Sequence, residues 1–232
     1  MPYRIFTIPK LDETVAEHNQ LALAQKFREF RLLALKTAPG AFASSYDDEA
    51  KRGLEHTFER LRHAKATQFV ALASASTQDT AHIHEANIAD LLDRDWLGFI
   101  VLIGLGEDLS SISAKSDPLS QVAKGTKLDG GAYETHNNNV IRFHLNGMFV
   151  SPAARRCGMG VRLIEAALGT AKSISDKTSC GFHCTIIVDE WNDAAIKLYE
   201  RVGFEVVATE TYGEDRIALR MELRRGGEAA GR

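Results

Sequence analysis

The spacing of apolar residues along the chain predicts alternating strands and helices. Residues 13–36 have helical spacing, and Pro39-Gly40 ends this helix. Its predicted apolar face comprises Leu21, Ala24, Phe27, Phe30, Leu33 and Ala34. Further helices are predicted at residues 47–64, 158–171 and 192–201, and strands at residues 3–8, 68–73, 96–103, 141–150, 182–188, 205–211 and 216–223. This order indicates an α/β fold whose middle strands are antiparallel.

Two long polar stretches interrupt the pattern, at residues 74–95 and 104–139. The first has weak helical character near residues 88–92, and the second is rich in Gly, Ser, Lys, Asp and Asn. Loops of this length are uncommon inside a compact domain. We therefore predict one domain over residues 1–223 with two insertions, followed by a disordered tail at residues 224–232.

The composition is that of a soluble globular protein and does not indicate a particular activity. The chain is 44% apolar and 25% charged, as is usual for soluble globular proteins, and its net charge of −3 gives no overall attraction to nucleic acid or to membranes. The first ten residues do not resemble a signal peptide, and no stretch reaches the roughly 18–20 apolar residues of a membrane helix. Three cysteines, an odd number, favour reduced thiols in the cytosol or nucleus, and we expect a cytoplasmic protein.

The segment from Met148 to Gly160 carries the strongest indication of function. A strand runs into Pro152, and a turn with two arginines and two glycines then leads into an amphipathic helix. The first turn of a helix presents unpaired N–H groups and partial positive charge, and glycines allow a phosphate to approach the backbone. We therefore expect a diphosphate to bind mainly to main chain of the turn residues Arg155, Arg156, Cys157, Gly158, Met159 and Gly160.

Two other phosphate-binding motifs fit this segment less well. The dinucleotide motif requires a third glycine, but position 163 is leucine. The Walker A motif requires Gly-Lys-Ser or Gly-Lys-Thr, which this turn lacks.

The same turn resembles the coenzyme A loop of the GNAT superfamily of N-acetyltransferases. The matching pattern is Val150-x-Pro152-x-x-Arg155-x-x-Gly158-x-Gly160. The family usually has glycine where this chain has Arg156. A second segment similar to the family is Asn192-x-x-Ala195-x-x-Leu198-Tyr199-x-x-x-Gly203-Phe204, and a third comprises Arg31, Ala34, Leu35, Pro39, Phe42, Ser45, Tyr46 and Glu49. The resemblance covers residues 3–70 and 140–223.

This resemblance implies both a fold and a reaction. The implied fold is a GNAT-like mixed, mostly antiparallel central sheet, flanked by helices, with two strands splayed apart at the acetyl-CoA site. The implied reaction is direct transfer of an acetyl group from acetyl-CoA to a primary amine, which we expect to be a small molecule. Two alternatives stay open: a protein or peptide N-acetyltransferase, and a non-catalytic protein that binds acyl-CoA.

The resemblance also implies roles for individual residues. Tyr199 is the candidate general acid for the departing CoA thiolate, although a tyrosine at this position is also explained by packing. Asn192 is expected either to contact CoA or simply to cap a helix. Backbone groups of Met148, Phe149 and Val150 are expected to bind pantetheine and the developing oxyanion, with Gly147 in a bulge that opens the strand edge.

The reaction also needs a general base to remove a proton from the amine. His144 is the candidate, because histidine titrates near neutral pH and some family members carry a His-x-His pair here. In this chain the second member of the pair is Asn146. Regular alternation would place side chains 144, 146, 148 and 150 on one face of the strand. Proton removal through ordered water to Glu134, His183, Asp189 or Glu190 stays equally open.

The remaining predictions concern the acceptor, metals and assembly. Phe42 and Tyr46 are expected to line the acceptor site. The His82-Ile-His84-Glu85 segment lacks a third spaced ligand, so it is interpreted as a polar loop and no metal is expected. Either a monomer or a homodimer is compatible with the sequence.

Overall fold

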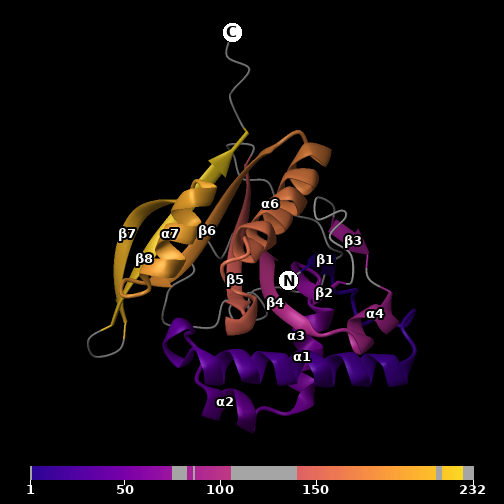
Figure 1. The fold of residues 1–232 in the computed structure, drawn as a ribbon. Helices are drawn as coiled ribbons and strands as arrows, with labels where there is room; N and C mark the ends of the chain where they lie inside the picture. Colours follow the sequence, from indigo (N-terminus) through magenta and orange to yellow (C-terminus); the bar gives the residue numbers. More distant parts are fainter. Residues whose placement is uncertain (1, 75–82, 86, 106–139, 213–215, 227–232) are drawn as a thin grey trace. The chain divides into compact units, whose positions relative to one another are not determined.

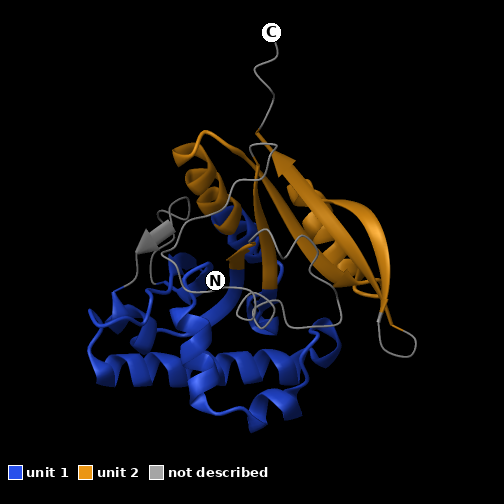
Figure 2. Ribbon diagram, turned by 180° about the vertical axis from the view of Figure 1, so that it is seen from behind, with its two compact units in different colours: residues 1–101, 147–166 blue, residues 102–146, 167–232 orange. Residues whose placement is uncertain are grey.

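The computed structural model describes residues 2–74, 83–85, 87–105, 140–212 and 216–226. The chain forms two compact units (Figure 2). Unit 1 comprises residues 1–101 and 147–166, and unit 2 comprises residues 102–146 and 167–232. Strands β4 (Trp96–Gly104) and β5 (Val140–Val150) contribute residues to both units.

Unit 1 combines strands in the order β3-β1-β2-β4 with helices of the N-terminal segment. Its other strands are β1 (Tyr3–Thr7), β2 (Ala66–Ala73) and β3 (Ile83–Glu85), with β1 antiparallel to β2 and parallel to β3. Its helices are α1 (Glu17–Thr37), a 3-10 turn (Pro39–Ala41), α2 (Tyr46–Lys51), α3 (Leu54–Arg62) and α4 (Ile88–Asp93). Helix α1 lies between these strands and α2 (Figure 1).

Aromatic side chains hold α1 against the strands of unit 1. Phe30 of α1 makes edge-to-face contacts with Trp96 and Phe99 of β4 and with Phe149 of β5, at ring-centroid distances of 5.7, 5.9 and 5.7 Å. Phe27, one turn earlier, contacts the same two rings of β4. Such pairs add about 0.5–1.5 kcal/mol each to the free energy gained by burial. Phe149, in the segment predicted to bind pantetheine, is therefore fixed by the core.

Unit 2 has the strand order β5-β6-β8-β7. Strands β6 (Gly181–Asp189), β7 (Glu205–Tyr212) and β8 (Arg216–Arg225) are accompanied by α7 (Asp193–Val202) and by the second part of α6 (Met159–Lys177). Strand β6 is parallel to β5 and antiparallel to β8, and β7 is antiparallel to β8. Helix α7 covers one face of these strands (Figure 1). The predicted fold class, a mixed sheet flanked by helices, is confirmed.

Three helix predictions differ from the structure. The predicted helix 47–64 is two helices, because Arg52 and Gly53 are extended and Gly53 caps α3. Helix α1 begins at Glu17 rather than residue 13, because residues 12–15 form a turn. In this turn the Asp12 side chain accepts the Thr14 N–H, and the Asp12 carbonyl accepts the Val15 N–H. Leu21 and Leu33 are 45% and 49% exposed, so the predicted apolar face was partly wrong.

Three other element boundaries also differ from the predictions. Helix α6 continues to Lys177, beyond the predicted residue 171. Strand β8 includes Arg224 and Arg225, which pair with His183 and Phe182, so the first two residues of the predicted tail are ordered. Within the first predicted insertion, α4 confirms the expected helical character, and β3 is a strand that the sequence pattern did not predict.

Gly98 allows β4 to approach its neighbours closely within unit 1. A Cβ at this position would lie 2.9 Å from the Phe149 carbonyl oxygen, 3.1 Å from Leu163 and 3.3 Å from Met159. We expect Gly98→Ala to lower the free energy of unfolding by about 1–3 kcal/mol, because backbone must move to admit the methyl group. Urea denaturation measures this loss.

The control for this prediction is Gly169→Ala, at a helical glycine where a Cβ would meet nothing within 4 Å. This change should raise the stability by about 0.5–1 kcal/mol, through helix propensity. Equal stability of Gly98→Ala and the wild type would contradict the close approach.

Candidate functional site

The phosphate-loop candidate lies entirely within unit 1. Strand β5 ends at Val150, a 3-10 turn spans Pro152–Ala154, and α6 begins at Met159. The intervening residues 155–158 are exposed. Arg156 and Gly158 have φ angles of +65° and +81°, and a Cβ at Gly158 would meet nothing within 4 Å. The predicted strand, turn and helix are present, and the space above Gly158 is open.

Side chains of the loop also brace its backbone. The Arg155 Nε donates to the Val150 carbonyl at 3.0 Å, which ties the loop to the end of β5. The Cys157 thiol donates to the Ala154 carbonyl at 3.0 Å. Arg156 adopts the left-handed conformation that glycine accepts without strain. This conformation accounts for the glycine that the family usually carries at this position.

Strand β5 contains one residue more than β4 over the same length. In unit 2 the Leu105 N–H donates to the Arg142 carbonyl, and in unit 1 the Ser151 N–H donates to the Leu97 carbonyl. From Leu97 to Leu105 is eight steps, whereas from Arg142 to Ser151 is nine. Gly147, between these bonds, has a φ of +65°. These features fit a β-bulge at Gly147, and an extra residue breaks the regular alternation that was expected from 144 to 150.

The β5–β6 ladder ends before either strand does. Paired positions run from Val140 and Gly181 to His144 and Thr185, whereas β6 continues to Asp189. Within unit 2, the last paired row therefore contains His144. The pairing of β5 with β6 therefore covers residues 140–144 and 181–185.

His144 is buried, with 2% of its surface exposed, and its Nδ1 atom is hydrogen-bonded to the Thr185 hydroxyl at 2.9 Å. Burial lowers the pKa of His144 to about 3, with a smaller contribution from the Arg220 guanidinium. The imidazole is therefore neutral at physiological pH, but it is a weak base. Thr185 was not predicted as its partner, because the pairing depends on the parallel register of β5 and β6.

Tyr199 is the buried residue of α7 and has 4% of its surface exposed. Its ring packs edge-to-face on Phe204 at a centroid distance of 5.9 Å. Burial raises the pKa of its hydroxyl above the ordinary value. The hydroxyl is consequently protonated throughout the neutral range, which is the state that a general acid requires.

Asn192 caps α7, since its side chain accepts the Ala195 N–H at 3.2 Å. The predicted helix cap at Asn192 is therefore present, while contact of Asn192 with CoA stays a prediction.

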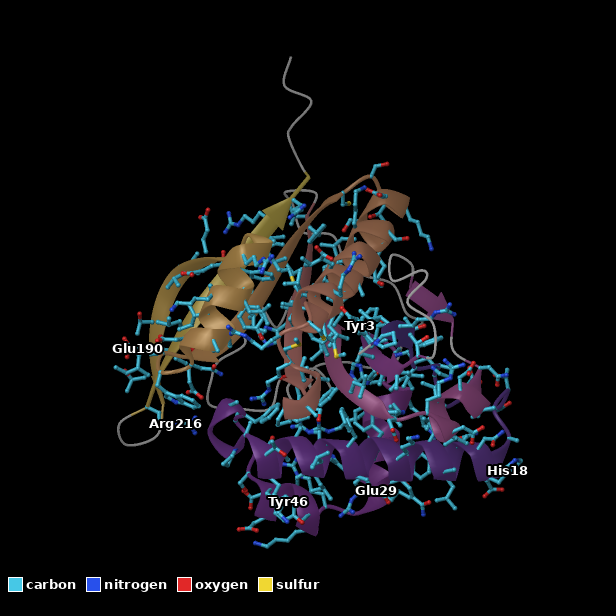
Figure 3. All side chains as sticks on the ribbon, in the orientation of Figure 1. Tyr3, His18, Glu29, Tyr46, Glu190 and Arg216 are labelled. Atoms are coloured by element: carbon cyan, nitrogen blue, oxygen red, sulfur yellow. The ribbon has the colours of Figure 1, made fainter. Side chains whose placement is uncertain are left out.

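Asp189, an alternative acceptor of the amine proton, is buried, and its Oδ2 atom lies 2.6 Å from the Nη2 of Arg216. Burial nevertheless raises the pKa of Asp189, and Arg216 opposes this effect. His183 pairs with Glu222 at 2.9 Å, while Glu190, labelled in Figure 3, is exposed. Glu134 lies outside the described residues.

Of the two predicted acceptor residues in unit 1, Phe42 follows the 3-10 turn and Tyr46 is the first residue of α2. Phe42 is 9% exposed and stacks against the Arg31 guanidinium, whereas Tyr46, labelled in Figure 3, is 39% exposed. Ser45 caps α2 by accepting the Asp48 N–H at 3.1 Å. Only Tyr46 of this pair presents a substantial surface to solvent.

The described residues contain no cluster of three or more His, Cys, Asp or Glu side chains suited to a metal ion. His82 of the discounted segment lies outside them. No disulfide joins the three cysteines, all of which lie among the described residues. No helix in the described part of the chain has the length and apolar character needed to cross a bilayer.

Comparison with known proteins gives two sequence matches. Residues 121–206 match a family described as an acetyltransferase (GNAT) domain. The chain is also 35% identical over 63 residues to the peptidyl-lysine N-acetyltransferase YjaB of Escherichia coli K12, over 27% of this chain and 36% of that protein. The match thus spans about a third of the length of this curated relative.

Solved structures show the same fold. Arabidopsis thaliana NAA60 in complex with a bisubstrate analogue aligns with a TM-score of 0.53 and 14% identity, over 97% of this chain and 99% of that chain. A GNAT superfamily phosphinothricin acetyltransferase from Sinorhizobium meliloti, in complex with AcCoA, aligns with a TM-score of 0.51 and 13% identity, over 100% and 93%. These likenesses, at 14% and 13% identity, concern the fold. Together with the match of residues 121–206, they indicate a likeness to GNAT acetyltransferases.

Proposed function

We propose that the protein is an acetyl-CoA-dependent N-acetyltransferase that transfers an acetyl group directly to a primary amine. The exposed turn between β5 and α6 carries this proposal, because its glycine conformation and open space suit a diphosphate. Arg155 and Arg156 add positive charge at the same turn, and the start of α6 supplies N–H donors. No separate acyl-enzyme is needed in such a reaction.

Each chemical requirement of the transfer has a candidate group. Backbone groups of residues 148–150 would bind pantetheine and stabilise the oxyanion. Tyr199 would protonate the departing sulfur, and its raised pKa keeps that proton available. His144 is neutral, so it can accept a proton, but its lowered pKa makes it a weak acceptor. Water-mediated removal of the amine proton therefore stays an alternative to His144.

A small-molecule amine is the proposed acceptor, bound near Phe42 and Tyr46. The second candidate is a lysine side chain of a peptide, which the match to the peptidyl-lysine N-acetyltransferase favours. We further propose a cytoplasmic enzyme, as a monomer or homodimer, that uses no metal.

Binding of CoA is tested by matched glycine variants. We expect acetyl-CoA and CoA to raise the melting temperature of the wild type, whereas Gly158→Ala should weaken CoA affinity about tenfold by filling the open space. Gly203→Ala is the control, because Gly203 also has a positive φ, of +106°, but caps α7 in unit 2. Both variants carry left-handed strain, of about 1–2 kcal/mol, and only Gly158→Ala should lose affinity. Absence of any shift with CoA compounds would contradict the proposal.

Turnover is tested by release of the CoA thiol. Four probe amines cover the acceptor classes: spermidine, L-lysine, phosphinothricin, and a lysine-containing decapeptide assayed with a free and with an acetylated N-terminus. Thiol release with the first three supports a small-molecule enzyme, and release with the acetylated peptide supports lysine acetylation. CoA binding without thiol release from any probe would favour the non-catalytic alternative.

A further inference from the structure

A buried carboxylate in unit 1 links three helices. Glu49 of α2 is 4% exposed and is shared by arginines from its two neighbours. Its Oε1 atom lies 3.8 Å from the Nε of Arg31 in α1. Its Oε2 atom lies 3.7 Å from the Nη2 of Arg60 in α3 and 3.4 Å from the Nη1 of Arg52. Removing one partner of a buried ion pair is costly, so this network fixes the relative positions of its helices.

The two buried arginines of this network have different surroundings. Arg31 lies 5.5 Å from the Phe42 ring centroid and donates to the Ser44 hydroxyl at 3.5 Å. Its Nη1 atom is 3.7 Å from the position that a Cβ would take at Gly147. One guanidinium thus contacts the segment between α1 and α2 and borders the space above Gly147 in β5.

The contacts given for Arg60 are with other groups. Its Nε donates to His56 at 3.1 Å, and its carbonyl accepts from the Gln68 side chain at 2.7 Å. Arg31 and Arg60 are each 5% exposed, and both pair with the same carboxylate. Their contributions to stability should therefore be similar, whereas the contact with Phe42 and the place beside Gly147 are those of Arg31.

We infer that Arg31 is a positioning residue, which sets the acceptor-binding segment against the strand that presents the acetyl group. This inference rests on the proposed function. The segment carries Phe42 and leads into Tyr46, the proposed acceptor residues, and Met148 follows Gly147 in the proposed acetyl-binding strand. A planar guanidinium can pair with Glu49, stack on Phe42 and reach Ser44 together, which a lysine ammonium cannot. Arg31 touches none of the reacting atoms and acts through these neighbours.

The test compares Arg31→Gln with Arg60→Gln, using acetyl-CoA and whichever of the four probe amines the wild type acetylates fastest. Both variants should lose similar thermal stability. Arg31→Gln should raise the KM for the amine and lower kcat, each about tenfold, while the KM for acetyl-CoA changes less than twofold. Arg60→Gln should keep all three constants within about twofold of the wild type.

Identical kinetic constants in the two variants would overturn the inference, as would a tenfold rise in the KM for acetyl-CoA in Arg31→Gln. If Arg31→Gln does not fold, Arg31→Lys retains the charge beside Glu49 and loses the planar group. A wild-type rate for Arg31→Lys would likewise overturn the inference. If the wild type binds CoA but acetylates no probe, the proposed function fails instead.

Discussion

Tyr199→Phe is expected to lower kcat by about two orders of magnitude, the usual contribution of general acid catalysis. The substitution removes only the hydroxyl, and phenylalanine can retain the edge-to-face contact with Phe204. Because Tyr199 is buried and its pKa is raised, the wild-type hydroxyl is protonated throughout the neutral range. The KM for acetyl-CoA should change less than threefold. Steady-state kinetics from pH 6 to 9, with the fastest probe amine, measure both constants.

Phe204→Leu distinguishes a catalytic role of the Tyr199 hydroxyl from a packing role of its ring. This change removes the aromatic partner of Tyr199 and leaves the hydroxyl, so it should lower stability while kcat stays near the wild-type value. If Tyr199 serves only to pack α7, Tyr199→Phe will be nearly neutral at every pH. That result would remove Tyr199 from the chemistry and leave the CoA loop assignment intact.

The protein is expected to lose stability steeply in acid because of His144. The pKa of this buried imidazole is lowered to about 3, whereas the unfolded chain takes up the proton near pH 6.5. Between these values the unfolded state binds more protons, so the free energy of unfolding falls as the pH falls. One such group contributes a slope of at most about 1.4 kcal/mol per pH unit. Urea denaturation at pH 7.0, 6.0, 5.0 and 4.5 measures this slope.

Two histidine variants identify the source of the acid sensitivity. His144→Gln cannot titrate and can still bond to Thr185, so its stability should depend less on pH. His18→Gln, at the exposed end of α1 (Figure 3), is the matched substitution of a histidine on the surface. The same slope in His144→Gln as in the wild type would show that other groups cause the sensitivity.

The pKa of His144 also sharpens the question of the general base. If His144 removes the amine proton, the acidic limb of kcat/KM should lie near pH 3, below the range in which we expect the protein to stay folded. A limb between pH 6 and 7 that persists in His144→Gln would belong to another group. Activity loss without a shifted limb would indicate that His144 matters through its position beside Thr185.

Local patterns in the sequence predicted most of the fold. Strands such as β6 alternate clearly, with Phe182, Cys184 and Ile186 buried, and the helix of residues 192–201 was bounded by a capping Asn192 and a Gly203 stop. The segment 47–64 failed because its apolar spacing continues across Arg52 and Gly53. Gly53 was the one indication in this segment that the helix is interrupted, but a single glycine within a helical pattern is also tolerated.

Local sequence patterns could not predict contacts between segments that are distant in the chain. The loop from Arg155 to Gly160 was predictable because one short stretch contains the strand, the turn and the helix start. The His144–Thr185 bond depends instead on which strands are adjacent and in what register. Arg31 and Glu49 were noted as part of a motif, but their ion pair joins helices that only the fold brings together.

The extra residue near Gly147 has a consequence for chimeric proteins. In a strand, inserting or deleting one residue turns every later side chain over to the opposite face. A hybrid that joins the first part of this chain to the C-terminal part of a relative must therefore keep the number of residues in β5, including Gly147. A hybrid that loses this residue would place the core-facing Phe149 on the opposite face of the strand.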